Sequence, residues 1–154
     1  MATVTILNDE EALAEAAAER VTSLLEASLS ARRSAVVCLS GGRTPQRLYE
    51  LLADASHPWR ARIDWPRVHV FWGDERHVPP DHPDSNFGTA HHALLAHVPI
   101  PANQVHRMRG ELADAAAAAR EYESLVPETF DIMLLGLGED AHIASVFPGS
   151  PLLE

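Results

Sequence analysis

Residues 35–52, AVVCLSGGRTPQRLYELL, indicate the fold class, because a strand, a glycine turn and a helix follow one another without a break. Residues 35–39 form an apolar run with two β-branched valines, the pattern of a strand covered on both faces of a parallel sheet. Beyond the turn, Leu48, Leu51 and Leu52 keep the spacing of one helical face. The stretch predicts an α/β fold with an open, mostly parallel, Rossmann-like sheet flanked by helices.

The turn between this strand and helix has the composition of an anion cradle. Two glycines let backbone N–H groups approach a ligand, Thr44 can cap the helix, and Pro45 fits its first turn. A plain strand-to-helix turn without a ligand has the same composition, so the residues alone leave both interpretations open. The candidate phosphate-binding residues of this turn are Ser40, Gly41, Gly42, Arg43 and Thr44.

A second strand is expected at residues 68–72 (VHVFW), and the charged turn Gly73-Asp74-Glu75-Arg76 follows it. Arg76 can offer a two-pronged hydrogen-bonding fork to a phosphate. Asp74 can orient that arginine or contact sugar hydroxyls. The alternative is a solvated turn whose charges pair with one another.

A third strand is expected at residues 131–135, with GLGEDAH (residues 136–142) after it. We expect Asp140 and His142 on the first turn of a following helix. Ligands of open α/β sheets bind outside the carboxyl ends of the strands, so the three turns should meet at one edge. The match of this turn to the dinucleotide-binding fingerprint is weak, because it comes late in the chain and the acidic residue expected about 20 positions on would lie beyond residue 154.

The remaining pattern predicts the scaffold of a single domain covering residues 1–154. We expect a strand at residues 3–7, a helix capped by Asn8, a helix capped by Ser85, a short strand at residues 104–108 and a helix over residues 111–125. No repeat, linker or low-complexity tail marks a second domain.

Composition excludes several classes of function. The formal net charge of −10 argues against a nucleic-acid partner, and no apolar run approaches the length of a membrane span. All basic residues are arginines, which excludes Schiff-base chemistry and a P-loop lysine. The single cysteine excludes an internal disulfide. Without a basic segment at residues 1–9, we expect a cytoplasmic location.

Histidines are frequent between residues 91 and 97, but we expect no metal site there. His92 and His97 are five positions apart, whereas ligands on one helical face lie three or four apart. No thiolate or ordered set of carboxylates accompanies them.

The ordered motifs together resemble the 6-phosphogluconolactonase family, within the wider group that also contains glucosamine-6-phosphate isomerase/deaminase. The resemblance covers essentially the whole chain. The matching segments are residues 39–52, 71–76 with 84–86, 100–101 through 106–107, and 131–149.

The resemblance implies hydrolysis of 6-phospho-D-glucono-1,5-lactone to 6-phosphogluconate in the oxidative pentose phosphate pathway, without a metal or organic cofactor. It makes His142 the general base and Asp140 the acidic residue beside it. It places the phosphate on the 40–44 turn and Arg76. The lactone is the only partner implied, and the oligomeric state stays undetermined.

Three features depart from the family pattern. Ala141 stands where glycine is usual, which strains the turn if the residue needs a positive φ and is harmless if it is helical. Arg43 replaces a small residue and either contacts the phosphate or points to solvent. The family's domain continues well beyond the His142 turn, so we expect the chain to lack C-terminal strands and to expose a sheet edge and apolar surface.

Two alternative functions remain. A deaminase of the same family has a glutamate shortly after the histidine, whereas residues 145–148 (SVFP) contain none, although Asp74 could still act as a base. A non-catalytic sugar-phosphate-binding fragment is the other alternative.

Overall fold

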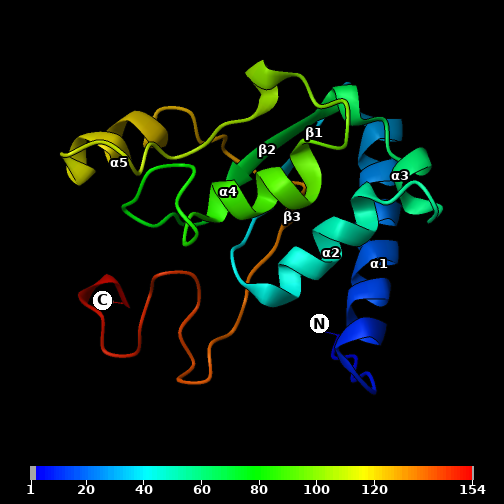
Figure 1. The fold of residues 1–154 in the computed structure, drawn as a ribbon, viewed down its shortest axis with the longest axis horizontal. Coiled ribbons are helices and arrows are strands. Elements are labelled where there is room, and N and C mark those ends of the chain that lie inside the picture. The colour runs from blue at the N-terminus through cyan, green and yellow to red at the C-terminus, as the bar shows by residue number, and fades with distance from the viewer. Residues whose placement is uncertain (1–2, 154) are drawn as a thin grey trace.

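A parallel sheet forms the centre of the molecule, in a computed structural model that describes residues 3–153. The order of its strands is β2–β1–β3 (Figure 1). The strands are β1 (Ala35–Leu39), β2 (Val68–Trp72) and β3 (Ile132–Met133). Both neighbours pair with β1 in parallel, and β1 matches β2 along its whole length. The predicted α/β class with a parallel sheet is confirmed.

Helices pack around this sheet. They are α1 (Glu10–Ala31), α2 (Arg43–Ala53), α3 (Trp59–Arg62), α4 (Asn86–Ala90), which continues as a π-helical turn over His91–Leu95, and α5 (Ala115–Glu123). Short 3₁₀ turns occupy Trp65–Arg67, Ala102–Gln104 and Pro151–Leu153. The long helix α1 packs on α2 and α3, and α5 lies at the opposite end of the molecule (Figure 1). None of the helices among residues 3–153 is long and apolar enough to cross a membrane.

The core lies between the sheet and the surrounding helices, with buried apolar side chains from α1, α2, α3, α4 and the π-helical turn. In α1 the buried apolar side chains recur every three or four residues, which puts them on one helical face. They are Ala14, Ala18, Val21, Leu25 and Leu29. Strand β1 is buried at four of its five positions, as expected for a central strand.

The N-terminal predictions need two corrections. Residues 3–7 form no strand, and Val4 and Ile6 are 84% and 90% exposed. A strand needs a neighbour for its backbone hydrogen bonds, and no part of the chain that the structure describes pairs with this segment. The cap of α1 is Asp9, not Asn8, because the Asp9 carboxylate accepts a hydrogen bond from the N–H of Ala12 at 2.8 Å.

One predicted strand and one predicted helix are shorter than expected. The expected strand at residues 104–108 is a single parallel bridge between Val105 and Val70. Helix α5 starts only at Ala115, because the Asp114 side chain caps it by accepting from the N–H of Ala117 at 3.0 Å. The predicted Ser85 cap of α4 is confirmed, with its hydroxyl 3.0 Å from the N–H of Gly88.

The segment after β3 differs most from prediction. The strand stops at Met133, and residues 134–153 contain no α-helix; residues 136–150 form a loop with isolated antiparallel bridges. Ala141 and Ala144 have φ values of 69° and 51°, which a right-handed helix cannot accommodate. Met133 and Leu135 are 49% and 56% exposed, so residues 132–135 are not covered on both faces.

Candidate active site

The three turns meet around one cavity of about 540 Å³ at the carboxyl edge of the sheet, as predicted from parallel strands. The cavity also borders α1 and the end of β3, so part of its wall is apolar. The predicted site residues that line it are Ser40, Gly41, Gly42, Arg43, Thr44, Asp74, Arg76 and His142. Asp140 lies beside His142 rather than on the wall.

The turn after β1 leaves the start of α2 open. The helix begins at Arg43 after Gly42, whose φ of 106° is a left-handed conformation that favours glycine. Thr44 therefore lies within the first turn and is not the predicted cap. Within residues 3–153 no side chain caps this helix, so N–H groups of its first turn stay available to an anion. Arg43 is exposed and forms no ion pair within residues 3–153.

Asn86 joins two of the turns and was not among the predicted site residues. Its side-chain amide donates to the carbonyl oxygen of Asp74 at 3.0 Å and to Asp74 Oδ1 at 3.2 Å. It also packs on the first turn, because a Cβ on Gly41 would lie 1.9 Å from Asn86 Oδ1. The available signal was the Asp-Ser-Asn segment that carried part of the family resemblance.

The two acidic residues of the second turn, Asp74 and Glu75, form hydrogen bonds with different parts of the chain. Glu75 anchors α4, because its carboxylate accepts from the N–H groups of Asn86 and Phe87 at 2.7 and 2.8 Å. Asp74 instead faces the third turn, where its Oδ2 accepts from the hydroxyl of Ser145 at 2.5 Å. Arg76 is exposed at the cavity and, within the described part of the chain, forms no ion pair.

His142 is oriented by Asp140. The Nδ1 atom lies 2.5 Å from Asp140 Oδ1, and this hydrogen bond lowers the pKa of the Asp140 carboxyl. An ionised carboxylate can only accept, so Nδ1 donates to it, and in the neutral imidazole Nε2 keeps a free lone pair. Phe147 packs on the imidazole with ring centroids 4.7 Å apart. A side chain at Gly138 would collide with the imidazole, because its Cβ would lie 2.2 Å from Nδ1.

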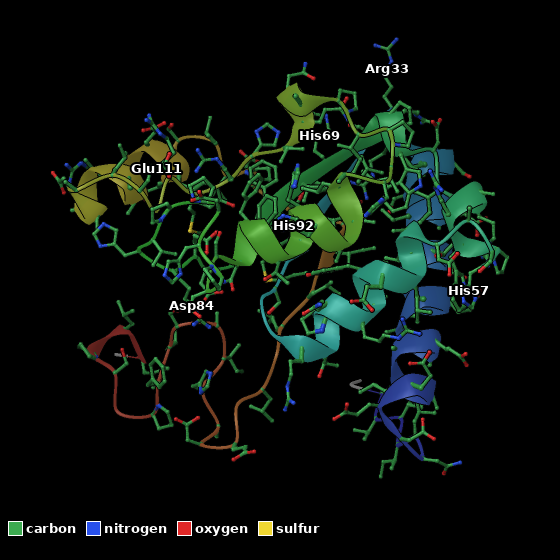
Figure 2. The ribbon with its side chains drawn as sticks, in the orientation of Figure 1. Arg33, His57, His69, Asp84, His92 and Glu111 are labelled. Carbon is green, nitrogen blue, oxygen red and sulfur yellow. The ribbon has the colours of Figure 1, made fainter. Side chains whose placement is uncertain are left out.

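Other histidines come from different parts of the chain, among them His57, His69 and His92 (Figure 2). His92 Nδ1 lies 2.7 Å from the carbonyl oxygen of Gly88, and His97 Nε2 lies 2.9 Å from that of His92. His69 on β2 contacts His106 at 3.2 Å through their ring nitrogens. Residues 3–153 contain no group of three or more histidine, cysteine or acidic side chains arranged to hold a metal ion.

A family model described as glucosamine-6-phosphate isomerases/6-phosphogluconolactonase matches residues 8–154. The chain belongs to this family. A 6-phosphogluconolactonase of Synechocystis sp. is 40% identical over an alignment that covers 97% of this chain and 64% of the relative. One from Mycobacterium tuberculosis is 38% identical, covering 96% and 64%. The chain therefore spans about 64% of the length of these relatives.

Solved structures agree with the family assignment. The 6-phosphogluconolactonase of Thermotoga maritima superposes with a TM-score of 0.80 at 33% identity, covering 92% of this chain and 62% of that one. The enzyme from Trypanosoma brucei gives a TM-score of 0.80 at 32% identity, covering 97% and 64%. A monomeric glucosamine-6-phosphate deaminase has a TM-score of 0.80 at 24% identity and shows only that the fold is shared.

Proposed function

We propose that this chain carries the active site of a 6-phosphogluconolactonase, which hydrolyses 6-phospho-D-glucono-1,5-lactone to 6-phosphogluconate. The observation that carries the proposal is the Asp140–His142 pair beside the cavity that the open start of α2 and Arg76 also line. A proton acceptor and an anion site therefore face one space. The names of the relatives support the same reaction.

The phosphate of the substrate binds at the start of α2. Two exposed arginines that line the cavity, Arg43 and Arg76, form no ion pair among residues 3–153 and supply positive charge. Free N–H groups and the positive end of the helix dipole add to it. Anchoring this remote group positions the lactone carbonyl against His142, which lowers the entropic part of the barrier.

His142 acts as the general base in this proposal. Its Nε2 takes a proton from water while the water oxygen attacks C1 of the lactone. The bond between C1 and the ring oxygen then breaks, and the proton on Nε2 passes to the ring oxygen. Asp140 keeps the imidazole in the required tautomer and stabilises the imidazolium between these steps.

The donors to the tetrahedral oxyanion are restricted by the loop itself. The N–H groups of Gly138, Ala141 and Ile143 already donate to carbonyl oxygens within the loop. We therefore assign this task to the backbone N–H groups of Gly136 and Leu137, two residues that line the cavity.

Two substitutions test the proposal in the full chain. We expect His142→Ala to lower kcat for the lactone by about 100-fold or more, because general-base catalysis is lost.

We expect Arg76→Ala to raise KM several-fold and to affect kcat less, because it removes ground-state binding. Hydrolysis is followed as proton release, corrected for spontaneous ring opening.

A histidine outside the cavity provides the matched control. His91 is exposed on the π-helical turn, and His91→Ala should keep the wild-type kinetics. An unchanged kcat in His142→Ala would remove it as the base. Ammonia release from glucosamine 6-phosphate, measured in parallel, would instead support the deaminase alternative. The expected cytoplasmic location stays a prediction.

A further inference from the structure

The loop that carries His142 has few attachments to the rest of the protein. Its backbone bonds are internal, such as Gly138 N–H to the carbonyl of His142 at 2.8 Å and Val146 N–H to that of Ile143 at 2.9 Å. Within residues 3–153, the only side-chain hydrogen bond that links residues 136–153 to an earlier part of the chain joins Ser145 to Asp74.

Asp74 is a firm anchor for this bond. Asn86, which is 5% exposed, donates to both the carbonyl oxygen and Oδ1 of Asp74. Oδ2 is left to accept from Ser145 at 2.5 Å, and a hydrogen bond to an ionised carboxylate is stronger than one between neutral groups. The Ser145 hydroxyl thus connects a loop to a fixed part of the second turn.

The loop also needs a restraint. Ala141 and Ala144 lie on either side of His142, and both have left-handed backbone conformations. Such conformations cost free energy for alanine, so they persist only where surrounding contacts hold them. Ser145 follows the second of these residues directly and is therefore well placed to hold that turn.

We propose that Ser145 is a positioning residue whose hydrogen bond to Asp74 holds the loop in the conformation that presents His142 to the cavity. This inference rests on the proposed function only for its effect on turnover. Its effect on the loop can be measured without any substrate.

Hydrogen exchange of the full chain tests the loop directly. In Ser145→Ala we expect amide exchange in residues 136–150 to become about tenfold faster, with exchange in β1 and β2 unchanged. Ser145→Thr keeps the hydroxyl at an exposed position and should exchange like the wild type. Ser150→Ala is the matched control, because within residues 3–153 that hydroxyl accepts a hydrogen bond only from the N–H of Leu152.

Kinetics then separates positioning from general damage. Ser145→Ala should lower kcat for the lactone about tenfold and change KM less than twofold, since the phosphate site is untouched. Ser145→Thr should restore the wild-type kcat. Three results would each overturn the inference. They are exchange in Ser145→Ala equal to that of the wild type, an unaltered kcat despite faster exchange, and a Ser145→Thr variant that restores neither the exchange rate nor kcat. A wild-type chain without lactone hydrolysis would refute the proposed function instead, and exchange would still decide the role of Ser145 in holding the loop.

Discussion

Ala141 shows how the backbone conformation of a single residue can matter beside His142. The sequence left two cases open, in which Ala141 is either harmless in a helix or strained at a positive φ. The φ of Ala141 is 69°, which establishes the second case. A left-handed alanine suffers close contact between Cβ and its own backbone, which glycine avoids.

We therefore expect Ala141→Gly to raise the free energy of unfolding by up to about 1 kcal/mol, measured by urea denaturation. The control is Ala119→Gly in α5, an exposed helical position where glycine should lower the same quantity by up to about 1 kcal/mol. Equal effects of the two substitutions would show that the left-handed backbone of Ala141 is not strained.

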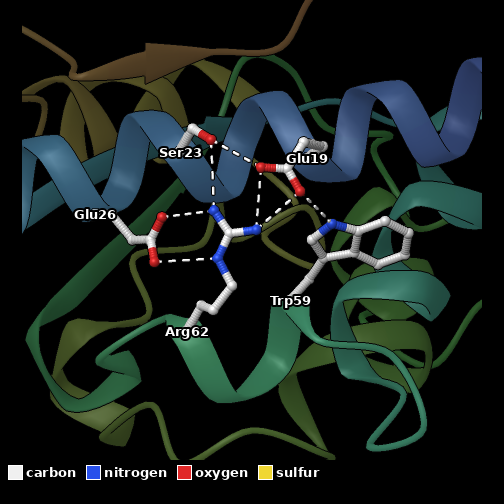
Figure 3. Close-up of polar contacts among 5 residues, drawn as sticks. All are labelled: Glu19, Ser23, Glu26, Trp59 and Arg62. Atoms are coloured by element: carbon white, nitrogen blue, oxygen red, sulfur yellow. Dashed lines mark hydrogen bonds and ion pairs between the residues drawn. The ribbon is translucent and has the colours of Figure 1, made fainter.

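At the scale of elements, α3 depends on its contacts with α1. A helix of four residues cannot be stable by itself. Arg62 donates to both Glu19 and Glu26 of α1, with shortest distances of 2.8 and 2.6 Å (Figure 3). Trp59 adds a hydrogen bond from its Nε1 to Glu19 at 3.0 Å, with its indole buried.

These contacts have a predictable dependence on pH. Hydrogen bonds from Arg62 and Trp59 lower the pKa of Glu19 to about 2. A lowered pKa in the folded state stabilises the fold above the ordinary glutamate pKa, and the effect disappears as the pH falls through about 2.

We expect Arg62→Ala to lower the thermal unfolding midpoint at pH 7, with a smaller difference from wild type at pH 2. Arg62→Lys should recover only part of the loss, because an ammonium cannot bind both carboxylates in the same way. Arg33 forms no ion pair within residues 3–153 and points away from the body of the molecule (Figure 2). Arg33→Ala is therefore the control, and a midpoint as low as that of Arg62→Ala would contradict the argument.

At the scale of the whole molecule, several large apolar side chains are exposed in the segment that follows β3. Leu135, Leu137 and Phe147 are 56%, 73% and 51% exposed, and Leu152 and Leu153 are 77% and 63% exposed. Residues 136–153 run along one side of the molecule, away from α3 (Figure 1). The sequence-based expectation of exposed apolar surface is confirmed, whereas a single domain over residues 1–154 stays a prediction.

Exposed edges and apolar patches favour association. We expect the sedimentation coefficient of the chain to rise with its concentration, and replacement of Leu152 and Leu153 by lysine to reduce that rise. Val4 and Ile6 are also exposed but lie on the N-terminal segment, so their replacement by lysine is the control. A coefficient independent of concentration would contradict this expectation.

The sequence by itself determined the strands β1 and β2, the helices α1 and α2, and the meeting of three turns at one edge. These follow from local patterns, since apolar runs and helical stripes state which face of each element is buried. The sequence also showed that residue 141 could be strained, because alanine tolerates a positive φ less well than glycine does.

Only the tertiary structure decided how the turns are joined. The loop after β3, the bond between Ser145 and Asp74 and the packing of Asn86 on Gly41 depend on residues far apart in the chain. No local sequence pattern predicts such contacts, because each partner segment can adopt several backbone conformations that are allowed on their own. The energy that selects among those conformations arises only when the three turns are brought together.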